Sequence, residues 1–136
     1  MNRRLMLAAV ALPLLAGCTT IDALMNPDPA SQPARVVFFT EDSPTLDETG
    51  RATVRGAAEV ARAYPSARVN VFGYAGPVGG VAFNRVLSEQ RAQYVAQLLR
   101  ENGVAADRVF VVPRGPVPFD QAPIESRRVE IRMAAQ

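Results

Sequence analysis

Arg91 is the residue of this chain whose position most needs a chemical explanation. On a helical wheel with about 100° per residue, it shares one stripe with Asn84, Ser88, Val95 and Leu98. That stripe is the apolar face that we expect to pack on a sheet, and an unpaired charge buried there would cost several kcal/mol. Arg91 therefore either lays its alkyl chain over the core with its head in solvent, or it holds an anionic partner.

Composition excludes most catalytic and metal chemistry. The chain has no histidine and no lysine, and Cys18 is its single cysteine. Without imidazole, most zinc sites, Ser-His and Cys-His nucleophile pairs and imidazole acid–base catalysis are excluded. One cysteine can form neither an internal disulfide nor a metal site. We therefore expect no metal and no cofactor.

A carboxylate-based enzyme, such as a hydrolase, is the catalytic hypothesis that remains. Its candidate residues are Glu41, Asp42 and Asp47, which form the only dense acidic group of the sequence. These acids lie where helix N-termini attract acidic residues for structural reasons. We therefore expect that the protein is not an enzyme.

The charge of the chain does not indicate a nucleic-acid partner. The formal net charge of +2 comes from Arg3 and Arg4, because the remaining arginines and acidic residues are equal in number. No basic patch stands out along the sequence, so we expect no nucleic acid.

The N-terminus is typical of an export signal. Arg3 and Arg4 precede the short apolar run Leu5–Leu15, which is too short for an ordinary membrane-spanning helix. The run ends in Leu15-Ala16-Gly17-Cys18, which resembles the lipobox of bacterial lipoproteins. That resemblance implies that residues 1–17 are removed and that Cys18 becomes the acylated N-terminus. The alternative is an ordinary secretory signal whose cysteine is incidental.

Residues 18–34 are predicted to be a lipidated cysteine followed by a tether. Pro27, Pro29 and Pro33 alternate with small and polar residues, which favours an extended path over a packed element. At about 3.1 Å per residue, the tether would hold a domain several nanometres from the bilayer. Thr19 follows the cysteine in place of aspartate, and by analogy with known lipoproteins this favours the outer membrane, with the domain facing the periplasm.

The remaining sequence, residues 35–136, alternates between strand and helix patterns. The expected strands are Arg35–Phe39, Arg68–Gly73, Arg108–Val112 and Arg127–Met133. The expected helices are Thr45–Tyr64, with a capping box at Thr45 and Glu48, and a helix from Asn84 to Asn102-Gly103. Residues 114–122 are expected to form a proline-rich loop.

This order predicts a β-α-β-α-β-β, α+β fold with two layers. Two helices should pack on one face of a mixed four-stranded sheet. Right-handed crossovers make the first pairings parallel, and the last strand can join antiparallel. Glycines 73, 76, 79 and 80 fit neither the Walker pattern nor G-x-G-x-x-G, so they are interpreted as turn formers.

A longer motif spans the second strand, the loop and the second helix. Its residues are Gly73-Tyr74-Ala75-Gly76-Pro77-Val78-Gly79, then Asn84, then Leu87-Ser88-Glu89-Gln90-Arg91-Ala92 and Val95. This pattern resembles the central motif of OmpA-like domains, as in the peptidoglycan-associated lipoprotein and the C-terminal part of MotB. Ser126-Arg127-Arg128-Val129-Glu130-Ile131 similarly resembles the closing N-R-R-V-E-I of that family.

The resemblance implies a site for the peptidoglycan stem peptide. Its candidate residues here are Arg91, Asn84, Tyr74 and Gly76. In the family, the arginine of L-S-x-x-R-A grips a carboxylate of the stem peptide, and an aspartate holds the diaminopimelate ammonium. That aspartate position is Gly76 in this chain, so half of the clamp is missing.

A second departure concerns the end of the first strand. By our alignment, Phe39 occupies a position that is usually acidic or polar and that helps to line the ligand site. Asp120 or Glu125, in or just after the proline-rich loop, are the candidates for a replacement carboxylate.

Two functions are therefore expected from the sequence. The first is an outer-membrane lipoprotein whose OmpA-like domain associates noncovalently with peptidoglycan, weakened by Gly76. The alternative is an OmpA-like module that no longer binds peptidoglycan and instead serves as a structural or protein-interaction element of the cell envelope.

Overall fold

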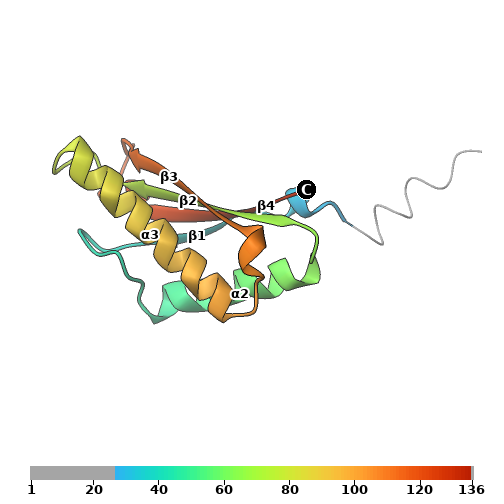
Figure 1. Cartoon of the computed structure of the whole chain (residues 1–136). Helices are drawn as coiled ribbons and strands as arrows, with labels where there is room; N and C mark the ends of the chain where they lie inside the picture. The colour runs from blue at the N-terminus through green and yellow to red at the C-terminus, as the bar shows by residue number, and fades with distance from the viewer. Residues whose placement is uncertain (1–26, 136) are drawn as a thin grey trace, which may run out of the picture.

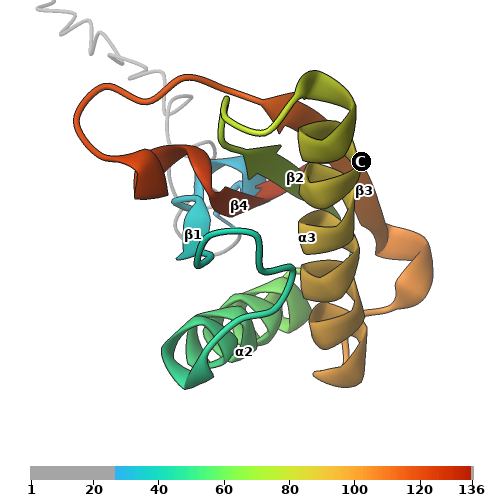
Figure 2. The ribbon, with the colours of Figure 1, turned by 90° about the vertical axis from the view of Figure 1, so that its left-hand side faces the viewer.

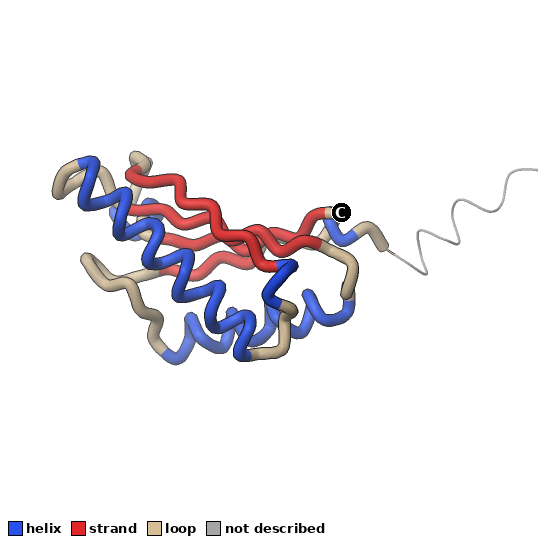
Figure 3. Tube along the Cα trace, viewed as in Figure 1, coloured by secondary structure: helices blue, strands red, loops and turns tan. Residues whose placement is uncertain are grey.

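The apolar stripes of the sequence pair into two layers. The computed structural model describes residues 27–135. Within them, two long helices cover one face of a four-stranded sheet (Figures 1 and 3). The predicted α+β fold is confirmed. The predicted signal peptide, Cys18 and the first part of the tether lie outside the described residues.

The sheet has the order β1-β4-β2-β3. Its strands are β1 (Arg35–Phe38), β2 (Arg68–Ala75), β3 (Val109–Pro116) and β4 (Arg128–Ala134). Strands β2 and β3 pair in parallel, and β4 is antiparallel to both β1 and β2. The prediction that the first pairings are all parallel was therefore wrong for β1 and β2. These two strands run in the same direction, but β4 lies between them and its Val129 and Ile131 fill the centre of the core.

Helix α2 (Glu48–Ala63) begins later than predicted. Asp47 is its N-cap, because the Asp47 carboxylate accepts a hydrogen bond of 2.8 Å from the backbone N–H of Gly50. The hydroxyl of Thr45, the predicted cap, lies 3.2 Å from the hydroxyl of Ser43 and is engaged there. The buried face of α2 consists mainly of small residues, which let the helix approach the sheet closely.

Helix α3 (Val81–Glu101) begins three residues before Asn84. Gly80 precedes it with φ 91°, a conformation that a side chain would strain. The buried side of α3 includes the predicted stripe from Asn84 to Val95. Gly73 of β2 faces this helix, and a Cβ atom there would lie 2.0 Å from the carbonyl oxygen of Ser88. Only glycine therefore permits this approach of helix to sheet.

Strand β3 runs four residues beyond its predicted end at Val112. It is an edge strand, where Pro113 and Pro116 can be accommodated without a lost ladder bond. Gly115, with φ 73°, lies where the register shifts, and its N–H donates a 3.0 Å hydrogen bond to the Ser88 hydroxyl. Three short 3-10 segments complete the fold, η1 (Pro29–Ser31), η2 (Ala106–Arg108) and η3 (Pro123–Ser126).

Two local contacts close the end of the domain where β1 begins. Segment η1 lies against β4, where the tether was predicted to be extended, and the Gln32 amide donates to the Tyr64 hydroxyl at 3.0 Å. Arg108, only 8% exposed, donates to the carbonyls of Ala61, Tyr64 and Ala67. It thereby satisfies carbonyls at the C-terminal end of α2 and beyond. No helix among residues 27–135 is long and apolar enough to cross a membrane.

Candidate functional site

A cleft of about 190 Å³ opens at the end of the sheet opposite to the start of β1. Three segments meet there: the loop after β1, the loop between β2 and α3, and the segment from Phe119 to Arg127 that precedes β4. Figure 2 looks at this end of the domain, with the three loops toward the viewer. The cleft is lined by Glu41, Asp42, Gly76, Pro77, Val78, Asn84, Leu87, Arg91, Phe119, Pro123, Ser126 and Arg127.

Arg91 lies at the inner wall of this cleft and is fully buried, with 0% of its surface exposed. Its Nε donates to the carbonyl of Ser43 at 3.0 Å, Nη1 to that of Tyr74 at 3.2 Å, and Nη2 to that of Thr40 at 3.1 Å. Arg91 therefore joins the loop after β1 to the end of β2. Its head does not reach solvent as the first sequence interpretation supposed. Its partners in the described chain are carbonyl dipoles rather than a carboxylate.

The charge of Arg91 is only partly compensated. The pKa of Arg91 is lowered to about 10, chiefly by burial and also by the nearby Arg127 guanidinium, while the Asp42 carboxylate opposes this shift. The side chain is still a cation at neutral pH. A guanidinium has five N–H donors, and the three hydrogen bonds to carbonyls leave two of them for another acceptor. Arg91 therefore holds the fold and keeps two N–H donors without a partner among the described residues.

Arg127 brings a second guanidinium into the cleft, which the sequence analysis did not include among the site residues. Its Nε atom is buried and has no hydrogen-bond partner among the residues that the structure describes. Burial of an unpaired donor of this kind costs about 1–3 kcal/mol. An acceptor that reached this Nε atom would recover this free energy. Only the resemblance of residues 126–131 to the family's closing motif pointed toward this position.

Two carboxylates, Glu41 and Asp42, line the same cleft. Both side chains are exposed, and Asp42 has φ 53°, a left-handed conformation that aspartate tolerates better than most residues. Their place in the sequence predicts that these acids lie beside a helix N-terminus, but α2 begins only at Glu48. The loop after β1 instead carries them to the cleft that Arg91 lines.

The other predicted site residues, Asn84, Tyr74 and Gly76, have different positions and roles in the structure. Asn84 is 2% exposed, and its amide donates to the carbonyls of Val78 and Gly80 at 2.7 and 3.1 Å. It therefore fastens the loop to the first turn of α3 rather than opening the helix. The Tyr74 carbonyl binds Arg91, while the Tyr74 ring packs under the Arg128 guanidinium, on the other face of the sheet. Gly76 lines the cleft.

Phe39 and the two candidate replacement acids lie elsewhere. Phe39 is a core residue, 1% exposed, and its ring centroid is 5.2 Å from Arg91 Cζ, so it packs beside Arg91 and does not line the cleft. The Glu125 carboxylate accepts hydrogen bonds from the backbone N–H groups of residues 120–122. These N–H groups, that of Asp120 above all, lower the pKa of Glu125. Neither Glu125 nor Asp120 lines the cleft.

The cleft therefore places two guanidiniums and two carboxylates around one opening. Such an arrangement can receive a zwitterion, with an anionic group near Arg91 and Arg127 and a cationic group near Glu41 or Asp42. Among residues 27–135, no three histidine, cysteine, aspartate or glutamate side chains are placed to hold a metal ion.

Comparison with known proteins agrees with this fold. Residues 38–132 match the sequence model of the OmpA family. The chain is 38% identical over 104 residues to the probable lipoprotein YiaD of Escherichia coli, covering 72% of this chain and 48% of that protein. It is 33% identical over 102 residues to the peptidoglycan-associated lipoprotein of Legionella pneumophila, covering 71% of this chain and 58% of that one.

A solved structure resembles the domain closely in shape. The peptidoglycan-associated lipoprotein of Burkholderia pseudomallei superimposes with a TM-score of 0.68 at 24% identity, covering 82% of this chain and 99% of that chain. The curated relatives are longer, and the chain spans about half the length of YiaD. The predicted resemblance to the OmpA-like family is therefore confirmed.

Proposed function

Because this chain belongs to the OmpA family, whose sequence model matches residues 38–132, we propose that it is an envelope lipoprotein whose cleft binds the peptidoglycan stem peptide. The observation that carries the proposal is the presence of both signs of charge in one cleft, with Arg91 and Arg127 beside Glu41 and Asp42. Relatives named peptidoglycan-associated lipoprotein and peptidoglycan-binding protein ArfA support the same ligand class.

The roles of the side chains follow from their donors and charges. A stem-peptide carboxylate is assigned to the free N–H groups of Arg91 and to the unpartnered Nε of Arg127. The ammonium of diaminopimelate is assigned to Asp42 or Glu41, in place of the carboxylate that Gly76 lacks. Each charge-assisted hydrogen bond contributes about 1.5–3 kcal/mol when it is desolvated.

The proposed affinity is lower than that of a complete family clamp. Glu41 and Asp42 are exposed, so water competes with the ligand ammonium and the interaction is screened by salt. Gly76, which also lines the cleft, contributes no charge to it. Peptidoglycan association should therefore be reversible and sensitive to ionic strength.

The test is co-sedimentation of the fragment 27–136 with purified sacculi that contain diaminopimelate. The variants are Arg127→Gln and the double change Glu41→Gln with Asp42→Asn, which leave the three carbonyl bonds of Arg91 in place. Each should lower retention about tenfold or more, as expected for the loss of one charge-assisted bond. Arg85→Gln on the exposed side of α3 is the matched control and should be retained like the wild type. Equal retention of all variants would contradict the proposed site.

One observation favours the second candidate, a protein-interaction module of the envelope. Val78, Val81, Phe83 and Val86 are all more than half exposed beside the cleft, at 81, 65, 52 and 53%. An apolar rim of this kind suits a protein surface better than a sugar or a short peptide. If the wild type does not sediment with sacculi while its fold is intact, this second function is the better description.

The lipid anchor is a separate part of the proposal and concerns residues outside the described ones. The lipobox around Cys18, together with relatives that are lipoproteins and outer membrane proteins, supports an anchor in the outer membrane with the domain in the periplasm. Cys18→Ser should release the protein from membranes or leave an uncleaved precursor. Normal processing and unchanged membrane partition of that variant would contradict the anchor.

A further inference from the structure

The face of the sheet that carries no helix is unusually rich in arginine. Residues of β2 and β4 alternate strictly, so the side chains between the core residues all emerge on this face. Four arginines lie there, Arg68, Arg114, Arg128 and Arg132, with Glu130 as the one acidic residue among them. We call the face of the sheet that these five residues share the open face.

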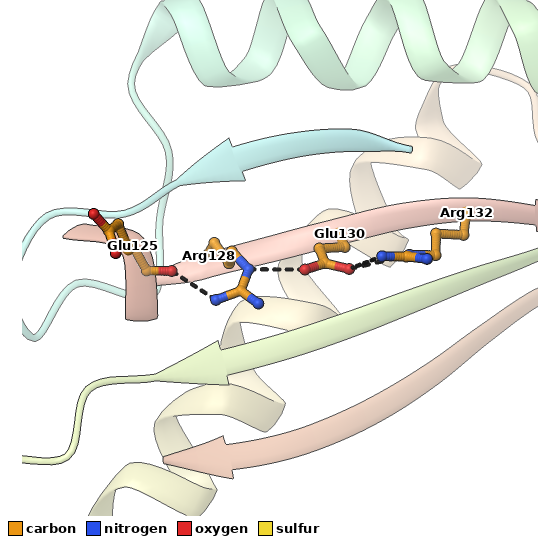
Figure 4. A network of polar contacts seen from close by, with 4 residues as sticks. All are labelled: Glu125, Arg128, Glu130 and Arg132. Atoms are coloured by element: carbon orange, nitrogen blue, oxygen red, sulfur yellow. Dashed lines mark hydrogen bonds and ion pairs between the residues drawn. The ribbon is translucent and has the colours of Figure 1, made fainter. Parts of the chain in front are cut away.

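One half of the open face is partly neutralised by its own acidic residue. The Glu130 carboxylate lies between Arg128 and Arg132, with contacts of 2.8 Å to each (Figure 4). Burial alone would raise the pKa of Glu130, but the hydrogen bonds from the two arginines outweigh it and hold the pKa below its usual value. Two cations thus share one anion along β4, and a positive charge remains.

The other half of the open face has no acid of its own. Arg68 stacks on the Phe110 ring at 3.8 Å, and Arg114 on the Phe72 ring at 5.0 Å. Neither forms an ion pair with a carboxylate of residues 27–135. A guanidinium that stacks on a ring keeps its N–H donors in its own plane, directed sideways and available to acceptors. The β2–β3 half of the face is therefore a row of oriented, uncompensated cations.

We propose that the open face docks on an anionic bilayer surface. Charge complementarity indicates an anionic partner, because the four arginines still outnumber Glu130 and the Glu125 carboxylate near Arg128, on a domain whose total charge is close to zero. The arginines are spread over three strands instead of converging on one pocket, so they match many separate phosphates better than a single ligand. Phe110, which is 37% exposed beneath Arg68, adds an apolar contact of the kind that suits a lipid interface.

The position of the tether supports a bilayer over an acidic protein as the occupant. This step rests on the proposed lipid anchor at Cys18, which would leave only residues 19–28 between the bilayer and η1, the first segment that packs on the domain. A tether of that length gives the bilayer a high effective concentration, so even weak contacts would be populated. The cleft lies at the end of the sheet opposite to the start of β1. If the open face lay flat on the bilayer, the cleft would therefore not be directed toward the sacculus. Bilayer docking and peptidoglycan binding should therefore compete.

The experiment uses the fragment 27–136, which contains every described helix and strand and lacks the anchor. A cooperative thermal transition first shows that the fragment is folded. Its binding is then measured by flotation with vesicles of phosphatidylcholine alone and with vesicles that contain phosphatidylglycerol in equal parts. We expect binding only to the anionic vesicles, weakened by salt.

The test variant is Arg68→Gln with Arg114→Gln, since neither residue leaves an orphaned acid and neither lines the cleft. The control is Arg85→Gln with Arg100→Gln, which removes the same charge from the exposed side of α3. The test variant should bind anionic vesicles about tenfold or more weakly, since each arginine near an anionic surface contributes about fivefold, while the control should bind like the wild type.

Two results would overturn the proposal. Equal weakening of test variant and control would show that binding depends on net charge and not on the open face. No binding of the wild type to anionic vesicles at low salt would leave an acidic protein surface as the better-matched partner. Sacculus co-sedimentation of the same test variant should be unchanged, so a failure of the peptidoglycan proposal would be seen separately.

Discussion

Replacing Arg91 by methionine should remove much of the free energy of unfolding of this domain. Methionine keeps the length of the side chain but removes the donors that reach Thr40, Ser43 and Tyr74 at 3.0–3.2 Å. Each hydrogen bond to a charged group contributes about 1.5–3 kcal/mol, whereas relief from burying the cation offsets part of the loss. Water from the adjoining cleft can satisfy some of the orphaned carbonyls. We therefore expect the free energy of unfolding to fall by about 3–5 kcal/mol, near the lower end of the summed contribution of the three hydrogen bonds.

The measurement is thermal unfolding followed by circular dichroism. For a domain of this size each kcal/mol lowers Tm by roughly 4–8 °C, so Arg91→Met should melt roughly 15–30 °C below the wild type. Arg91→Lys should lie between the two, because one ammonium keeps the charge but cannot reach three carbonyls in different directions.

Arg108 provides the matched control for this prediction. It is also buried and also donates to three carbonyls, but at the end of the domain remote from the cleft. Arg108→Met should therefore cost a similar amount of stability and, where still folded, keep its binding to sacculi. If Arg91→Met melts within a few degrees of the wild type while Arg108→Met does not, the three carbonyl bonds are not what holds Arg91 in place, and the reasoning fails.

Three further predictions concern single positions. Gly73→Ala should cost about 3 kcal/mol or more in urea unfolding, because its Cβ would lie 2.0 Å from the Ser88 carbonyl oxygen and the backbone would have to move; a neutral effect would contradict the close packing. The free energy of unfolding should fall as the pH drops through the lowered pKa values of Glu125 and Glu130, since the unfolded chain then binds more protons than the folded one. Urea unfolding between pH 7 and 3 measures this fall. Glu130→Gln should flatten the slope of the free energy of unfolding against pH. Gly76→Asp should strengthen the binding of diaminopimelate peptide in calorimetric titration. The variant should keep its fold, because Gly76 does not have a positive φ. A weaker or unchanged affinity would show that this wall of the cleft does not meet the ammonium.

Much of the fold could be predicted from local patterns. The alternation of Val129, Ile131 and Met133 gave the inward face of β4, and the stripe around Arg91 gave the buried face of α3. Element ends were less accurate. The extension of β3 through Pro113 and Pro116 depends on its place at the edge of the sheet, which no local pattern indicates.

The candidate site could be predicted only in part. Arg91, Asn84 and Gly76 share one continuous stretch of sequence, so a motif identifies them together. Glu41, Asp42 and Arg127 reach the same cleft from loops far apart in the chain. The role of Tyr74 was misjudged for a related reason, because only its backbone faces Arg91 and its ring lies on the other side of the sheet.

The sequence by itself determined the family, the two-layer architecture and the place of Arg91 on the inward face of its helix, because these depend on periodicity and on residues close in the chain. The tertiary structure decided what Arg91 contacts, which acids face it, and how the charges are distributed. A nearly neutral chain shows no basic patch when its arginines are read in order. Strands β2, β3 and β4 bring four of them to one face, since alternate residues of neighbouring strands emerge on the same side of a sheet.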